Sequence, residues 1–555
     1  MNLTNTVKTM WGAISFCGRK GLYILLVALL SGPFFNNAFA QGSLSGGLQT
    51  NGNFFVRDTS IGAANTPQYD NLFSGYEGWL NLNYSNFGFD LGLRFDFYLN
   101  SNLPDPQAAF TGQGIGNWFI KRKIHKLDIT AGHFYDQIGS GIIFRAYEER
   151  LLGIDNSLMG LRLAYDLSDN WKVKTMLGRQ RNPFGSNGVV SSTYKPIIAS
   201  LSFDGYVPVS DDVQLAPGGG VVNRVLDEES MALIVADINT YAPIDSFIPK
   251  YNVYAFSLYN TLTVKDFSWY IEGAFKTNEA IVGPEGILVD KFGSVIMTNL
   301  SYSRKGFGIT VQGKRVENFI LRTSPNEILN EGVINFLPPT ARQNTKRLAA
   351  RYNANTSELS EWAFQVDLLF KPAKNINAAL NFSNITDLDG NLLFREAFAE
   401  ARFKNLGTTK KWTTTLGLQY QEYNQDFYEV KPGVPNVISV VPMTEIIYKI
   451  DRKKTIRTEV QYQHTQQDFG SFFYVLGEFT IAPSWSFSFS NMVNIKPRKT
   501  DERESYYDVS VGYTHKSNKF TFAWVKQIEG IVCTGGVCRF EPAFNGARIT
   551  LNSSF

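Results

Sequence analysis

Five charged side chains of both signs cluster in one segment, residues 137–158. They are Arg145, Glu148, Glu149, Arg150 and Asp155, and apolar residues lie between them. If the segment folds into a pore, opposed charges create a strong transverse field, by which many pores select solutes. The alternative is a surface loop whose charges are solvated or paired. Because Gly-Ser-Gly at 139–141 and the apolar residues suit a buried loop better, we treat the five residues as a candidate constriction.

Two cysteines near the C-terminus, Cys533 and Cys538, lie in the sequence VCTGGVC. Two glycines between the thiols allow a tight loop, and an oxidising compartment favours a disulfide. A metal site is the weaker alternative, because two sulfurs without a nearby histidine do not complete a tetrahedral ligand set. We predict a disulfide that staples a loop, and no metal site.

Catalytic chemistry has little support in this chain, which contains only four histidines. His464 near Asp468 is the one candidate for an acid–base pair, and residues of such common types are weak evidence. We therefore expect no enzymatic activity, no catalytic residue and no cofactor.

The elements that must position these residues are strands, because apolar and polar residues alternate along nearly the whole chain. Phe87, Phe89, Leu91, Leu93, Phe95 and Phe97 fall on one face, and the residues between them, including Arg94 and Asp96, fall on the other. Only a strand has a side-chain period of two. We expect a two-residue turn at Ser85-Asn86 before this strand.

The first 40 residues have the features of a cleaved export signal. Basic residues precede a short apolar run, and Ala38-Phe39-Ala40 is a small-x-small cleavage site. The apolar run of about ten residues is too short to cross a bilayer, which needs about 20. Removal of these residues leaves a chain of near-zero net charge, so we expect no nucleic-acid partner.

The repeated alternation after an export signal predicts an all-β fold, a transmembrane antiparallel up-and-down β-barrel of the outer membrane formed by residues 41–555. We count about 22 strands, with a range of 18–24. No later segment approaches 18 uninterrupted apolar residues, which argues against membrane helices. Alternation begins within a few residues of Gln41, so we expect no separate N-terminal plug domain.

Two regions remain: the longest stretch without alternation, and the residues that face the barrel interior. Residues 183–248 interrupt the pattern most and suggest a long insert, a lid or a docking region for a lipoprotein partner, although two more strands could lie there. The polar phase predicts a set of charged residues that face the lumen: Asp90, Arg94, Asp96, Glu272, Lys276, Lys314, Asp367, Glu396, Glu400, Arg402, Arg457, Glu459 and Glu478.

The final strand has Ile549 and Leu551 in one phase and ends at Phe555. An alternating terminal strand that ends on an aromatic residue resembles the signal read by the barrel-assembly machinery. We therefore expect this machinery as a partner during biogenesis and the outer-membrane bilayer as the environment of the folded chain.

Three blocks of sequence carry a family resemblance: GSLSGGLQTNGNFFVRD at 42–58, YDQIGSGIIFRAYEER at 135–150 and VCTGGVCRFEPAFNGARITLNSSF at 532–555. Together they resemble uncharacterised outer-membrane barrel proteins of Bacteroidota that share a domain of unknown function. The resemblance implies location and fold, and it brings no substrate or catalytic residue. From the residues themselves we expect a porin-like channel for small solutes, or alternatively a non-conducting accessory barrel of a secretion, biogenesis or uptake complex.

Overall fold

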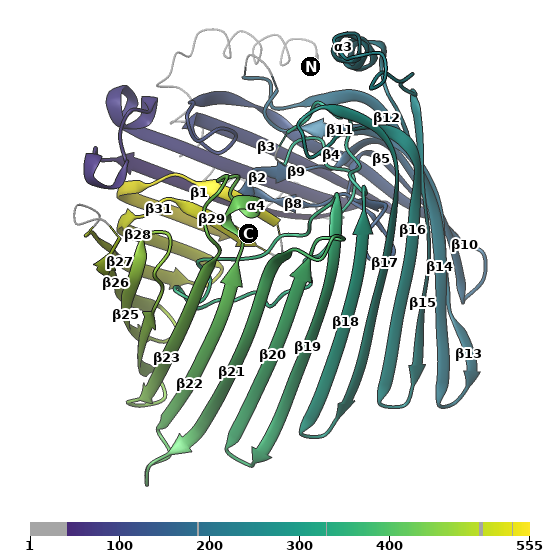
Figure 1. The fold of residues 1–555 in the computed structure, drawn as a ribbon. Helices are drawn as coiled ribbons and strands as arrows, with labels where there is room; N and C mark the ends of the chain where they lie inside the picture. The colour runs from purple at the N-terminus through teal and green to yellow at the C-terminus, as the bar shows by residue number, and fades with distance from the viewer. Residues whose placement is uncertain (1–41, 186–187, 329, 499–502, 535–536) are drawn as a thin grey trace, which may run out of the picture.

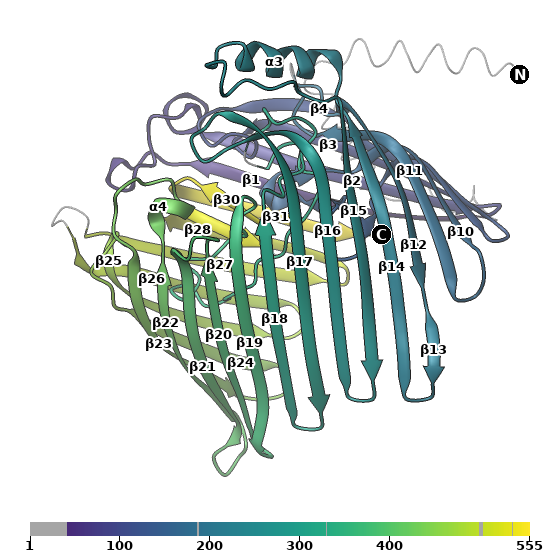
Figure 2. The same ribbon diagram turned by 45° about the vertical axis from the view of Figure 1, so that its right-hand side comes forward.

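The computed structural model describes residues 42–555 except 186–187, 329, 499–502 and 535–536. The predicted export signal at residues 1–40 lies outside the described residues. Within them, 24 antiparallel strands follow one another around a closed wall (Figures 1 and 2). Each wall strand pairs with its neighbours in the chain, and β31 pairs with β1 to close the sheet. The all-β antiparallel barrel is confirmed.

The wall strands vary in length, and their bounds are as follows: β1 (Ser43–Phe55), β2 (Ser74–Asn86), β3 (Phe89–Ser101), β4 (Phe110–Ile124), β5 (Leu127–Phe134), β10 (Leu158–Asp166), β11 (Trp171–Asn182), β12 (Ser192–Gly205), β14 (Val213–Val225), β15 (Asn252–Val264), β16 (Phe267–Val282), β17 (Leu288–Arg304), β18 (Phe307–Glu317), β19 (Ser360–Ala373), β20 (Ile376–Thr386), β21 (Leu392–Leu406), β22 (Trp412–Tyr423), β23 (Val437–Lys449), β24 (Lys454–Gln463), β25 (Gly470–Ile481), β26 (Trp485–Pro497), β27 (Ser505–His515), β28 (Asn518–Gln527) and β31 (Phe544–Ser554). The short strand β13 (Val207–Ser210) follows β12 and also pairs with β14.

The strand count exceeds the expected value of about 22, and the difference lies in residues 183–248. This range, expected as a long insert, contributes β12 and β14 to the wall. The sequence Ala216-Pro217-Gly218-Gly219-Gly220 hides a strand because three glycines give no alternating side chains to follow. Only the part after β14 is a long connection.

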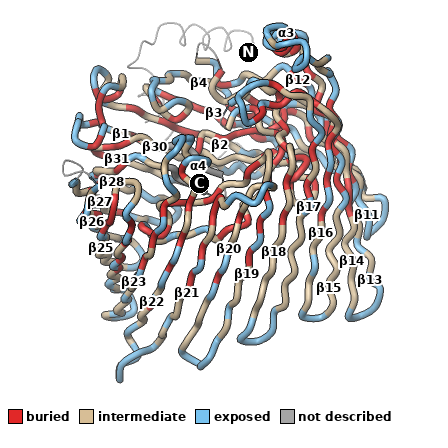
Figure 3. Tube along the Cα trace, in the orientation of Figure 1, coloured by how far each residue is buried: buried red, intermediate tan, exposed pale blue. Residues whose placement is uncertain are grey.

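The alternation of buried and exposed residues around the wall follows the predicted faces (Figure 3). In β3, Leu91, Leu93 and Phe95 are exposed on the outer face, whereas Arg94 and Asp96 are buried on the inner face. The exposed face is therefore apolar and the enclosed face polar, as lipid outside a barrel requires.

The turn between β2 and β3 differs from the expected position by two residues. The strands end and begin at Asn86 and Phe89, so the turn residues are Phe87 and Gly88. Both have positive φ, 51° and 75°, as a type I′ hairpin requires. Phe87 was expected in the strand because its apolar side chain fits the alternation, but it lies in the turn and is exposed.

The remaining elements lie in the connections between wall strands. The helix α3 (Glu228–Ile238) lies at the rim beyond the ends of the wall strands (Figure 2) and buries Met231, Ile234 and Ile238 against residues that include Ala280 and Leu288. The other elements are η1 (Thr59–Ile61), η2 (Gln68–Leu72), β6 (Gln137–Ile138), β7 (Phe144–Arg145), β8 (Glu148–Glu149), η3 (Arg150–Leu152), β9 (Ile154–Asp155), α4 (Gln425–Tyr428), β29 (Gly530–Thr534) and β30 (Val537–Glu541). None of the helices among the described residues has the length and apolar character to cross a membrane.

Candidate pore constriction

The segment between β5 and β10, which we call the inner segment (residues 135–157), lies inside the barrel. β5 and β10 have 8 and 9 residues, against 15 in β4 and 12 in β11. The chain therefore leaves the wall part-way along the barrel and forms two small hairpins, β6–β7 and β8–β9. Figure 1 shows β8 and β9 inside the ring of wall strands. Its side chains contact inward-facing residues of wall strands as far apart in the chain as β3 and β16.

An apolar cluster holds the first half of the inner segment in place. Ile138, Ile142, Ile143 and Phe144 are buried with inward-facing wall residues and with apolar residues of a second loop. Burial of each large apolar side chain contributes about 1.5–3 kcal/mol. This part of the lumen is therefore packed like a protein core.

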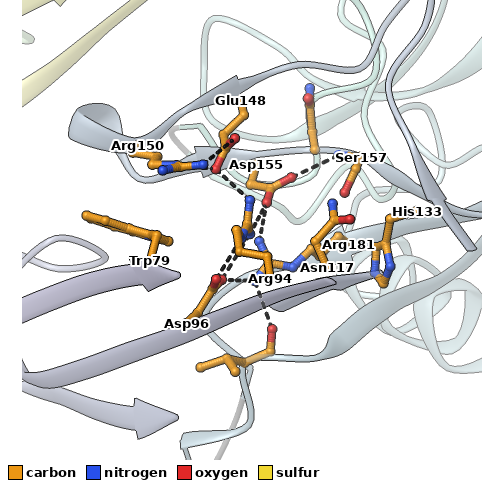
Figure 4. Close-up of polar contacts among 12 residues, drawn as sticks. Trp79, Arg94, Asp96, Asn117, His133, Glu148, Arg150, Asp155, Ser157 and Arg181 are labelled. Carbon is orange, nitrogen blue, oxygen red and sulfur yellow. Dashed lines mark hydrogen bonds and ion pairs between the residues drawn. The ribbon is translucent and has the colours of Figure 1, made fainter. Parts of the chain in front are cut away.

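A buried ionic network ties the second half of the inner segment to the wall (Figure 4). Arg94 of β3 lies 2.6 Å from carboxylate oxygens of Asp96, Asp155 and Glu148. Arg181 of β11 donates to Asp155 and lies 2.7 Å from Asp96. Two guanidinium groups, from β3 and β11, thus pair with three carboxylates, one from β3 and two from the inner segment. Pairing of this kind is what makes buried charge tolerable.

The charge state of Asp155 follows from this network. Burial by itself would raise the pKa of its carboxyl group, but the guanidinium groups of Arg181 and Arg94 outweigh burial and hold the pKa well below its usual range. Asp155 is therefore ionised at every physiological pH.

The structure brings three of the five candidate constriction residues together. Asp155 and Glu148 belong to the network, and Arg150 donates to Glu148 at 2.6 Å and to Gln49 of β1 at 3.2 Å. Arg145 lies elsewhere, with its guanidinium 4.2 Å from the ring centre of Phe336. Glu149 pairs through its backbone with Ile154 in the β8–β9 hairpin. The side chains of Glu148 and Arg150 are each 21% exposed, whereas Asp155 is buried.

Two further residues, Asp136 and Ser140, anchor the inner segment to the wall. The backbone N–H of Ser140 donates to Glu272 of β16 at 2.9 Å. Asp136 accepts from Arg162 of β10 and lies 3.1 Å from the ammonium of Lys174 on β11. Glu272 was predicted to face the lumen, but its partner could not be found from the sequence.

A second loop, residues 318–359 between β18 and β19, also enters the interior and was missed in the sequence. We call it the crossing loop. Its backbone bonds to the inner segment: Arg145 N–H donates to Ile334 at 2.9 Å, and Phe336 N–H donates to Gly141 at 2.9 Å. Two predicted lumen residues also bond to its carbonyls, Lys276 to Ile320 and Lys314 to Pro338. The available signal was its length without alternation, which is uncommon for a simple connection.

The remaining predicted residues have the following surroundings. The backbones of Cys533 and Cys538 pair opposite each other in the β29–β30 hairpin, while their side chains lie outside the described part, so the disulfide stays a prediction. Ile549 and Leu551 lie in β31, and Phe555 exchanges backbone hydrogen bonds with Gly46 of β1.

Asp468, the acidic partner considered for His464, accepts hydrogen bonds from Arg351 and Tyr352 of the crossing loop at 2.9 and 2.8 Å. Among the described residues, no group of three or more His, Cys, Asp or Glu side chains could hold a metal ion.

Comparison with protein families places the whole barrel in one group. The model of a family of unknown function, DUF6029, matches residues 19–555. The chain belongs to the DUF6029 family. A search of curated proteins gives no match.

Solved structures similar to this DUF6029 chain are bacterial barrels at low sequence identity. The translocation pore of the P pilus usher PapC is 12% identical, with 92% of this chain and 99% of that chain covered and a TM-score of 0.44. The siderophore receptor PirA from Pseudomonas aeruginosa is 7% identical, with 92% and 80% covered and a TM-score of 0.41. OccAB3 from Acinetobacter baumannii is 9% identical, with 93% and 100% covered and a TM-score of 0.35.

Proposed function

We propose that this protein is an outer-membrane barrel that conducts small solutes through a lumen narrowed by the inner segment and the crossing loop. The observation that carries the proposal is that both loops are continuous with wall strands and project into the interior, where hydrogen bonds with wall side chains hold them. The apolar outer face supports a lipid environment. We further propose a non-enzymatic role and delivery by the barrel-assembly machinery through the terminal strand.

Glu148 and Arg150 are the charged groups proposed to border the conducting path. They are partly exposed, whereas the guanidinium of Arg94 beneath them is 4% exposed. Opposite charges at a narrow point orient polar solutes and exclude large ones. Truncation of both side chains therefore widens the path while the buried Arg94, Arg181, Asp96 and Asp155 groups stay paired.

Liposome swelling and single-channel recording on purified protein test the proposal. We expect the wild-type barrel to admit a pentose, and the Glu148→Ala/Arg150→Ala double variant to show a higher conductance and to admit larger sugars. Lys195→Gln is the control, because Lys195 is 61% exposed and pairs with Glu229 of α3. A solute-tight, electrically silent barrel in all three proteins would refute conduction.

A second candidate function is a non-conducting accessory barrel that binds a lipoprotein. The surface that favours it is the connection after β14, where Leu233, Ile244 and Ile248 are 54%, 90% and 87% exposed. Exposed apolar residues at a rim are typical of partner contacts. Affinity purification from native membranes separates the candidates, since recovery of the barrel alone would contradict the accessory role.

A further inference from the structure

One stretch of the crossing loop, residues 341–351, is strongly basic, and we call it the basic strap. Its sequence, ARQNTKRLAAR, contains four cationic side chains and no carboxylate. The strap lies on the wall formed by β21 to β24. The backbone N–H of Leu348 donates to the side-chain oxygen of Gln461 at 2.8 Å, and Gln419 donates to the carbonyl of Ala349 at 3.0 Å.

The wall beneath the strap is acidic. The ammonium of Lys346 lies 2.7 Å from Glu445 of β23 and 2.7 Å from Glu459 of β24. Asn344 donates to Glu396 of β21 at 2.6 Å. Three inward-facing carboxylates therefore bind the strap, and one cation of the chain occupies the space between two of them.

The wall offers more acceptors than the strap fills. One oxygen each of Glu396, Gln419, Gln421 and Gln463 is buried and has no hydrogen-bond donor among the described residues, and these side chains are at most 1% exposed. A buried acceptor without a donor is costly. These oxygens lie on the inner face that the strap covers, so the surface is suited to a ligand with more N–H groups than the strap supplies.

One cation of the wall, Arg457, partly neutralises the negative charge of this surface. Arg457 lies 2.9 Å from Glu445, 2.6 Å from Glu459 and 3.6 Å from Glu478. Without the strap, the guanidinium of Arg457 would remain beside three carboxylates: Glu445, Glu459 and Glu478. The exposed surface would then be net negative.

We propose that the basic strap occupies a binding surface for cationic solutes, and that Lys346 takes the place of the ammonium group of such a solute. When the strap leaves, the carboxylates of β21 to β25 favour ammonium- and guanidinium-bearing solutes over anions. The inference rests on the proposed conducting function and adds the charge class of the solute and the element that competes with it.

The experiment replaces the strap with an 11-residue Gly-Ser segment and compares three matched proteins. The first carries only this replacement, the second adds Glu445→Gln and Glu459→Gln, and the third replaces α3, which also has 11 residues and lies outside the lumen. Lys346→Gln in the intact chain is a milder variant in case the replacement impairs folding, which heat modifiability on gels monitors.

Two measurements follow, one of transport and one of binding. In bilayers with a KCl gradient, we expect the strap replacement to raise conductance and shift the reversal potential toward that of K⁺, and we expect the added glutamines to abolish the shift. In detergent, we expect calorimetry to detect spermidine binding to the strap replacement, much weaker binding to the variant with glutamines, and none to the α3 replacement.

The outcomes separate the two proposals. A conducting strap replacement without cation preference, or spermidine binding that the glutamines leave unchanged, would overturn the cationic-solute surface while the conducting function stands. Spermidine binding that depends on Glu445 and Glu459 in a barrel that never conducts would support the surface and overturn the conducting function. If the α3 replacement raised the conductance as much as the strap replacement did, the strap would have no special role.

Discussion

Asp155 shows at the scale of one residue how the inner segment is held. Its carboxylate pairs with both Arg94 and Arg181, so Asp155→Asn leaves two buried cations with fewer partners. Removal of one partner of a buried ion pair costs about 3–5 kcal/mol, and because Asp96 still contacts both arginines, we expect a loss of about 3 kcal/mol.

Urea unfolding in detergent micelles measures this loss, with Glu229→Gln as the control. The Lys195–Glu229 pair is more than 60% exposed on both sides, and exposed pairs contribute less than about 1 kcal/mol. If the two substitutions lowered the free energy of unfolding equally, the network would not stabilise the barrel.

The ionisation of Glu327 makes the stability of the crossing loop depend on pH. Burial, followed by the nearby carboxyl group of Glu331, raises its pKa to about 7. The folded loop thus holds the proton more tightly than the unfolded chain does. Stability of the loop is full below about pH 4.5, falls as pH rises toward about 7, and is then constant.

The Glu327→Gln variant should abolish this loss, because an amide cannot ionise. We expect hydrogen exchange around the Arg322–Val333 backbone bridge to be equal in the variant and wild type at pH 5 and slower in the variant at pH 8. Because the variant and the wild type are compared at the same pH, the intrinsic effect of pH on the exchange rate cancels. Slower exchange in the variant at both values would contradict the assigned titration.

At the scale of elements, the pairing of β31 with β1 closes the barrel, and the last residue of the chain extends this pairing by one step. Gly46 and Phe555 exchange backbone hydrogen bonds at 2.9 and 3.0 Å, and a Cβ at Gly46 would overlap the Phe555 ring. We expect Gly46→Ala to reduce the yield of heat-modifiable barrel on refolding in detergent. Gly273→Ala is the matched control, since a Cβ there meets nothing within 4 Å.

Deletion of Phe555 in cells separates closure from the predicted assembly signal. We expect less barrel in the outer membrane with unchanged export. We expect refolding in detergent close to that of the wild type, because the Phe555 ring is 64% exposed and the β1–β31 pairs from Gly47 to Phe55 remain. A wild-type amount of assembled barrel in cells would refute the signal.

The strand elements could be predicted from the sequence wherever large apolar side chains mark every second residue. β3 is such a case, and its inner and outer faces agree with the prediction. β14 could not be followed because glycines at 218–220 erase the alternation. The β2–β3 turn was misplaced because Phe87 extends the apolar pattern although its positive φ requires a turn.

At the scale of the whole molecule, the sequence predicted several of the charged residues that face the interior, but not Arg181 or Glu445, and not which residues meet there. Arg94, Asp96, Glu396 and Glu459 were assigned to the inner face and are buried. Arg94, Glu396 and Glu459 each have a partner in a loop as well as in the wall, and the course of a loop depends on tertiary contacts rather than on a local period. For this reason the inner segment was recognisable by its charges, whereas the crossing loop, with no comparable local signature, was not.

The crossing loop leaves β18 and returns to β19, two adjacent strands of the wall. The strap therefore stays tethered after it detaches, and its return is a unimolecular event whose rate does not depend on how much protein is present. Such tethering gives Lys346 an effective concentration on the order of millimolar at the wall. A free monovalent amine would have to reach comparable levels to hold the strap away, whereas a polyamine could do so when dilute.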